Sequence, residues 1–112
     1  MHELALCDSI ARTVMAHAGS KQVESIHLRI GALRQVVPET LSYSWSIVTG
    51  GRHLDGSVLE IEVVPGQVVC DDCAALTALD RFYLACSQCG GTATRVVAGE
   101  EFLITSIDVV DP

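Results

Sequence analysis

The chain has 112 residues, of which 49% are apolar and 19% charged, and its formal net charge at pH 7 is −7. This length predicts one domain, or one domain with a small satellite, and the apolar content is enough to form a core. The basic residues are scattered along the chain, which disfavours nucleic acid as a partner. No apolar run is long enough to span a membrane and no signal-peptide pattern is present, so we expect a cytoplasmic protein.

Residues 4–18 predict an amphipathic first helix. Apolar residues recur there at the i, i+3, i+4 spacing, and Gly19 is placed to end the helix. Cys7 lies within the apolar stripe, so we expect it to be a buried thiol of the core. The expected stripe consists of Leu4, Cys7, Ile10, Ala11, Val14, Met15 and Ala18.

Three strands and a second helix follow. Residues 24–30 and 58–63 alternate between apolar and polar types, as half-buried strands do, and residues 102–110 are rich in β-branched types. Pro38 can occupy the first position of a helix, where Glu39 would favour the helix dipole. The residues expected to face the core are Ile26, Leu28, Ile30, Leu41, Trp45, Val48, Leu59, Ile61 and Val63.

This order of elements predicts an α+β fold, with two helices packed on a small, mostly antiparallel three-stranded sheet. The last strand is expected to return to the same sheet, which makes the cysteine-rich segment a zinc-ribbon-like tetracysteine insertion. We therefore expect an α+β domain formed by residues 1–66 and 99–112 and a zinc-binding module formed by residues 67–98. The edges of the sheet are compatible with either a monomer or a homodimer.

Four of the five cysteines form two C-x-x-C pairs, Cys70 with Cys73 and Cys86 with Cys89. Two thiolates at positions i and i+3 can hold an ion from one side, and a second pair completes the sulfur tetrahedron that zinc prefers. Gly90 follows the second pair, where such a turn needs a positive φ. Two disulfides or a redox dithiol are less favoured alternatives, and the spacing does not distinguish zinc from mononuclear iron.

The zinc is expected to be structural, because four sulfur ligands leave no open position for a substrate. The apolar content of the module is thin, so metal binding should supply most of its stability. That apolar content consists of Leu76, Leu79, Phe82, Tyr83 and Leu84.

The N-terminus offers a second set of metal ligands. If the first helix begins at Glu3 or Leu4, the α-amine of Met1 and the backbone nitrogen and imidazole of His2 can all reach one ion. Three nitrogens and one further ligand suit square-planar Ni(II) or Cu(II) better than zinc. On residue chemistry alone, however, His2 is better explained as an ordinary residue before a helix than as a metal ligand.

The remaining polar residues indicate no catalytic site. His27 is expected to be solvated on the polar face of its strand, with Glu60 and Glu62 as possible cross-strand neighbours in a structural pair. His17 lies where a cationic imidazole would favour the dipole of the first helix. The chain has no G-x-S-x-G, HExxH or phosphate-loop motif, so we do not expect an enzyme.

Several motifs occur in combination along the chain. It begins Met-His-Glu before an amphipathic helix, the first strand ends in Gly-Ala-Leu, and a Pro-Glu pair opens the second helix. The double C-x-x-C module comes late and is followed by the strand LITSIDV. Together these motifs resemble the HypA/HybF family of hydrogenase nickel-insertion accessory proteins, and the resemblance covers essentially the whole chain.

The resemblance implies a metallochaperone that transports Ni(II) and carries structural Zn(II). It implies nickel ligands at Met1, His2 and Glu3. In some members of the family an acidic residue at the start of the second helix completes the site, and Glu39 occupies the corresponding region here. The implied partners are a GTPase accessory protein of the HypB type and the large-subunit precursor of a [NiFe] hydrogenase. The alternative is a zinc-ribbon adaptor that binds protein without transferring nickel, and His2 is the residue that distinguishes the two hypotheses.

Overall fold

The computed structural model describes residues 3–79 and 85–110, which form two compact units. Unit 1 contains residues 3–29, 36–62 and 103–110. Unit 2 contains residues 30–35, 63–79 and 85–102. No helix in the described part of the chain is long and apolar enough to cross a membrane. Five residues named above lie outside the described residues: Met1, His2, Phe82, Tyr83 and Leu84.

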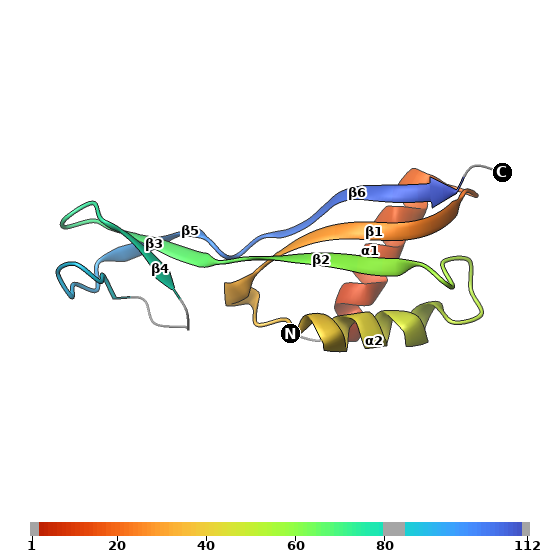
Figure 1. Ribbon diagram of the computed structural model, residues 1–112, viewed down its shortest axis with the longest axis horizontal. Coiled ribbons are helices and arrows are strands. Elements are labelled where there is room, and N and C mark those ends of the chain that lie inside the picture. Colours follow the sequence, from red (N-terminus) through yellow and green to blue (C-terminus); the bar gives the residue numbers. More distant parts are fainter. Residues whose placement is uncertain (1–2, 80–84, 111–112) are drawn as a thin grey trace. The chain divides into compact units, whose positions relative to one another are not determined.

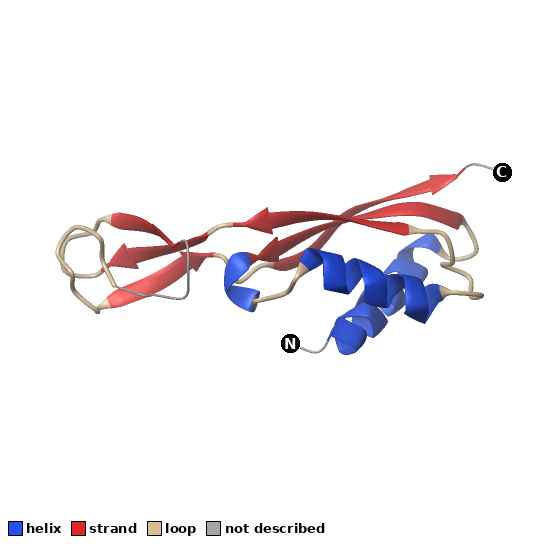
Figure 2. Ribbon diagram, turned by 60° about the horizontal axis from the view of Figure 1, so that its bottom comes forward, coloured by secondary structure: helices blue, strands red, loops and turns tan. Residues whose placement is uncertain are grey.

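Unit 1 is built on a three-stranded sheet with two helices on one face (Figures 1 and 2). The strand order is β2-β1-β6, so the last strand returns to the same sheet, as predicted, and its neighbour there is β1. The α+β fold class expected from the sequence is thereby confirmed. The elements are α1 (Glu3–Ala18), β1 (Gln22–Gly31), α2 (Pro38–Thr49), β2 (Val58–Val64) and β6 (Phe102–Val110).

The end of α1 and the start of α2 lie where the local sequence favours a helix boundary. Gly19 follows α1 at φ +60 and donates its N–H to the carbonyl of Met15 (3.0 Å), which satisfies one of the free carbonyls at the helix end. Pro38 is the first residue of α2, where a missing N–H costs nothing. The predicted helix boundaries are therefore confirmed by features of the local backbone.

The core of unit 1 lies between the helices and the sheet. Trp45 is buried in it, and its indole N–H donates to the hydroxyl of Ser57 (3.0 Å), which in turn donates to the carbonyl of Leu54 (2.6 Å). This series of hydrogen bonds gives the indole N–H of Trp45, the largest buried side chain, a partner in the core. The buried apolar residues of unit 1 are Cys7, Ile10, Val14, Ala18, Val23, Ile26, Leu28, Leu41, Trp45, Leu54 and Leu59.

Three side chains depart from the predicted apolar faces. Leu4 and Met15 were expected in the buried stripe of α1 but are 60% and 48% exposed, because the stripe that packs is narrower than the apolar pattern. Val63 was expected to face the core with Leu59, yet it is 49% exposed and Val64 is buried instead. The alternation of β2 therefore reverses at its end, where the strand enters unit 2.

Unit 2 contains a second antiparallel sheet, which the sequence did not predict as strands. Its order is β4-β3-β5, and the central strand pairs on both sides. The strands are too short to show a clear period, and the two C-x-x-C turns interrupt their apolar runs. The elements are β3 (Gly66–Cys70), β4 (Leu76–Leu79), β5 (Thr94–Ala98) and the single-turn helix η1 (Ala32–Arg34).

Three glycines bring backbone segments of unit 2 into close contact. A Cβ on Gly31 would lie 1.9 Å from the carbonyl oxygen of Gly99, and one on Gly99 would lie 2.6 Å from the Cα of Gly66. Hydrogen bonds fix this approach, because Gly31 donates to the carbonyl of Glu101 (2.7 Å) and Leu33 donates to that of Gly99 (2.8 Å). The start of β3, which leads to the first cysteine pair, is therefore held by backbone packing.

Candidate metal centre

The first cysteine pair lies on a tight turn at the end of β3. The N–H of Ala74 donates to the carbonyl of Cys70 (2.8 Å), and the N–H of Cys70 donates to the carbonyl of Ala75 (3.0 Å). These two bonds close the loop between Cys70 and Cys73, so that both thiols project from one side of the turn.

The second pair repeats the same backbone pattern. The N–H of Gly90 donates to the carbonyl of Cys86 (2.9 Å), and the N–H of Cys86 donates to the carbonyl of Gly91 (2.9 Å). Gly90 has φ +71, as predicted for this position. The two C-x-x-C segments thus form equivalent turns, and Ala74 occupies in the first the place that Gly90 occupies in the second.

Ala74 adopts φ +62, a left-handed conformation that is unfavourable for a residue with a Cβ. We expect Ala74→Gly to raise the free energy of unfolding of the metal-loaded protein by about 1 kcal/mol, because the strain is removed. Chemical denaturation in excess zinc would measure this difference. Gly90→Ala is the matched control and should lower the free energy of unfolding by a similar amount. A change of the same sign in both variants would contradict the expectation.

The four thiols converge on one point. Their sulfur atoms all lie within 4.8 Å of one another, and two of the separations are 3.7 Å (Cys70 to Cys89) and 3.6 Å (Cys73 to Cys86). A zinc–sulfur bond of about 2.3 Å gives a tetrahedron with edges of about 3.8 Å, so the array fits the ion. The separations are far longer than the about 2.0 Å of a disulfide, and all four cysteines are free thiols.

The four sulfurs differ in their surroundings. Cys70 and Cys86 are buried, whereas Cys73 and Cys89 are exposed. Hydrogen bonds from the N–H groups of Cys89 and Gln88 lower the pKa of Cys86 to about 6. The N–H of Ala75 lowers the pKa of Cys73, but hydrogen bonds with the thiols of Cys86 and Cys70 outweigh this effect and raise that pKa to about 12. An incoming ion must therefore displace protons, and binding is favoured by rising pH.

The first cysteine turn also contacts the segment that follows the second cysteine turn. The N–H of Asp71 donates to the carbonyl of Ala93 (2.8 Å), and its carboxylate accepts a hydrogen bond from Arg95 (2.8 Å). Arg95 lies twenty-four positions after Asp71, so this pairing could not be identified from spacing in the sequence. This exposed ion pair adds little stability by itself, but it fixes the direction of the turn.

Two of the four residues predicted for nickel are described, and both are in the first turns of their helices. Glu3 begins α1, and Glu39 is exposed in the first turn of α2. The two helices pack together near these ends, where the Cys7 thiol lies 3.8 Å from the carbonyl of Leu41. Burial, and next the charge of Glu3, raise the pKa of the Cys7 thiol, so it is the core thiol that was predicted.

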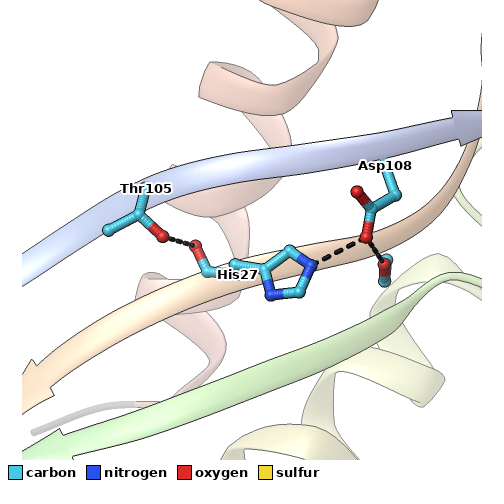
Figure 3. Close-up of polar contacts among 4 residues, drawn as sticks. His27, Thr105 and Asp108 are labelled. Carbon is cyan, nitrogen blue, oxygen red and sulfur yellow. Dashed lines mark hydrogen bonds and ion pairs between the residues drawn. The ribbon is translucent and has the colours of Figure 1, made fainter.

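His27 does not pair with Glu60 or Glu62, which were its expected neighbours. Its imidazole lies 2.7 Å from a carboxylate oxygen of Asp108 on β6, and the same oxygen accepts a hydrogen bond from Ser25 (Figure 3). Hydrogen bonds from Ser25 and His27 hold the pKa of Asp108 below its ordinary value. Glu62 instead accepts a hydrogen bond from Arg29 (2.9 Å).

This cluster contains the residue types of a catalytic triad but not its order. In a triad the imidazole lies between the hydroxyl and the carboxylate, so that it can take the proton of the hydroxyl. Here the carboxylate of Asp108 lies between Ser25 and His27, and the hydroxyl is not activated by the imidazole. The cluster therefore has a structural role, in which its hydrogen bonds connect β1 to β6.

The fold and the convergent thiols define a class of protein, a small α+β protein that carries a tetracysteine metal site. The family model described as "Hydrogenase/urease nickel incorporation, metallochaperone, hypA" matches residues 1–109. This chain belongs to the HypA family, whose members are nickel-incorporation metallochaperones for hydrogenase maturation.

Curated relatives agree with this assignment, and a solved structure shares the fold. Hydrogenase maturation factor HypA from Roseiflexus sp. (strain RS-1) is 39% identical, over 99% of this chain and 94% of the relative. The factor of the same name from Acidithiobacillus ferrooxidans is also 39% identical, over 97% and 99%. The solution structure of the Ni metallochaperone HypA from Helicobacter pylori shares the fold, with a TM-score of 0.69, 17% identity and full coverage of both chains.

Proposed function

We propose that this chain is a nickel metallochaperone for the maturation of a [NiFe] hydrogenase. In this proposal Met1, His2 and Glu3 bind Ni(II), and Cys70, Cys73, Cys86 and Cys89 hold a structural Zn(II). The observation that carries the proposal is the family match, which begins at residue 1 and includes the Met-His-Glu start. The chain acts as a carrier and catalyses no reaction of its own.

The ligand chemistry of the Met-His-Glu start supports the nickel part of the proposal. A chelate built on the nitrogens of Met1 and His2 supplies the α-amine, a backbone nitrogen and an imidazole to one ion. Nitrogen ligands that include an imidazole suit the tetragonal geometry of Ni(II). The carboxylate of Glu3 adds negative charge beside this ligand set, which further favours a divalent cation.

Glu39 is proposed as a further nickel ligand, on weaker grounds. It is exposed, and it lies two residues before Leu41, whose carbonyl contacts Cys7 in the second turn of α1. The first turns of the two helices therefore face a common region. The dipole of α2 also explains a carboxylate at this position, so nickel binding should depend less on Glu39 than on His2.

The zinc part of the proposal rests on the sulfur geometry. Four thiolates close the coordination sphere, so the ion would supply structure and no reactive position. Nickel would be taken up and released at the N-terminus while the zinc stays in place. The carrier would pass nickel to a GTPase accessory protein of the HypB type and to the hydrogenase large-subunit precursor. We place these steps in the cytoplasm, with the carrier as a monomer or homodimer.

Calorimetric titration of zinc-loaded, untagged protein with Ni(II) tests the nickel site. We expect one equivalent to bind to the native chain and to be lost in His2→Gln and in a chain extended by one N-terminal glycine. The extension displaces the α-amine while leaving every side chain in place. His17→Gln removes an exposed imidazole of the first helix, one that donates to the carbonyl of Thr13, and this variant should bind nickel normally.

Zinc content must be the same in all four proteins for the comparison to hold. Unchanged nickel binding in His2→Gln and in the extended chain would refute the N-terminal site. The zinc-ribbon adaptor without nickel transfer would then be the better hypothesis.

A further inference from the structure

The two cysteine turns are held to their sheet in different ways. The first turn continues a strand, because Cys70 is the last residue of β3 and pairs with Thr94 of β5. Its next residue, Asp71, extends this pattern by donating its N–H to the carbonyl of Ala93. Backbone pairing therefore holds Cys70 and Cys73 to the sheet, and the exposed ion pair between Asp71 and Arg95 supplements it.

The second turn, residues 86–89, lies outside the strands, and a side chain connects it to the sheet. The N–H of Ser87 donates to the hydroxyl oxygen of Thr77 on β4 (3.1 Å), and the two hydroxyl groups lie 3.1 Å apart. Ser87 in this turn corresponds to Asp71 in the first. The hydroxyl of Thr77 therefore accepts the hydrogen bond that the carbonyl of Ala93 accepts in the other turn.

Thr77 is well placed to act as a fixed acceptor. Its side chain is buried, and in the β3–β4 register it lies opposite Val68, which is itself only 1% exposed. A buried position in a paired strand restricts the rotamers of a β-branched residue. The hydroxyl oxygen is thus held by the sheet and does not follow the motion of the turn.

We propose that Thr77 is a positioning residue of the metal centre, which places Cys86 and Cys89 by holding the N–H of Ser87. This inference rests on the proposal that the four cysteines bind zinc. Fixing the Ser87 N–H fixes the peptide that joins Ser87 to Cys86. The next N–H, that of Gln88, then points to the sulfur of Cys86 (3.4 Å). Hydrogen bonds of this kind orient metal ligands and raise affinity.

Thr77→Val tests the inference, because valine keeps the branched shape and removes only the acceptor. We expect zinc affinity to fall by about 10- to 100-fold, the usual effect of losing such a partner, and zinc transfer to a chelator to become faster accordingly. In the zinc-loaded variant, alkylation followed by mass spectrometry should label Cys86 and Cys89 well before Cys70 and Cys73. A general loosening of unit 2 would instead expose all four thiols together.

Two further variants separate the hydrogen bond from packing. Thr77→Ser keeps the acceptor and should restore slow zinc release and the native alkylation pattern. Ser87→Ala removes a hydroxyl but keeps the N–H that donates to Thr77, so it should behave like the native chain. If Thr77→Val binds no zinc at all, recovery of binding in Thr77→Ser supports the inference.

Native zinc release in Thr77→Val would overturn the inference, as would simultaneous labelling of all four cysteines. Failure of Thr77→Ser to restore slow release would also overturn it. A native chain that binds neither zinc nor Co(II) would refute the metal site itself, and the inference with it. The failure of the proposed function is therefore distinguishable from the failure of the role assigned to Thr77.

Discussion

Removal of zinc is expected to unfold unit 2 and leave unit 1 folded. Few apolar side chains of unit 2 are buried, and two of its larger ones, Leu76 and Val97, are 64% and 50% exposed. A core of this size does not offset the entropy of ordering the segment, whereas structural zinc contributes on the order of 10–16 kcal/mol. Cys86→Ala or a strong chelator should therefore abolish slow amide hydrogen exchange in residues 63–79 and 85–102.

Amide exchange measured by NMR is the appropriate readout, because it reports on each unit separately. Cys7→Ala is the matched control, since it also removes a buried thiol but lies in the core of unit 1. It should cost about 1 kcal/mol of stability in unit 1 and leave zinc content and exchange in unit 2 unchanged. Persistent protection of unit 2 in the zinc-free protein would show that its sheet is stable without the ion.

Gly31→Ala is expected to cost about 4 kcal/mol or more of folding stability. The new methyl group would lie 1.9 Å from the carbonyl oxygen of Gly99 and 2.5 Å from the nitrogen of Glu100, and both are backbone atoms. Side-chain overpacking in a core costs about 1–3 kcal/mol because flexible groups can move aside. The backbone near Gly99 is fixed by hydrogen bonds to Gly31 and Leu33 on either side of the contact, so the cost should be larger.

Urea denaturation followed by circular dichroism would measure the loss. Gly19→Ala provides the control, because Gly19 has φ +60 and nothing lies within 4 Å of the added methyl group. It should cost about 1–2 kcal/mol, the strain of the left-handed conformation alone. Equal losses in the two variants would mean that the crowding around Gly31 is relieved without breaking the hydrogen bonds.

The helices and the longer strands could be predicted because their signals are local. The apolar period of α1, Gly19 at its end and Pro38 at the start of α2 each act within one or two turns of the chain. The alternation in β1 and most of β2 is likewise a property of neighbouring residues. The short strands β3, β4 and β5 were missed, because four or five residues between turns do not establish a period.

In the candidate site, too, the local features could be predicted and a contact between distant residues could not. The two C-x-x-C spacings predict a tetracysteine cluster, because each pair is constrained by its own turn and one ion satisfies both. The left-handed conformation of Ala74 could have been predicted, since Ala74 occupies the position that Gly90 occupies in the other turn. The role of Thr77 could not have been predicted, because nothing near it in the sequence indicates that it accepts a hydrogen bond from a residue ten positions away.

By itself, the sequence of this protein determined the fold class, the boundaries of both helices and the four convergent cysteines. The tertiary structure alone decided that His27 pairs with Asp108 on β6, 81 positions away, and that Gly31 packs against Gly99. The reason is physical: helical and strand periods, helix ends and C-x-x-C turns depend on residues a few positions apart. Pairing across a sheet and close backbone contact depend on the register of distant strands, which a single sequence does not encode locally.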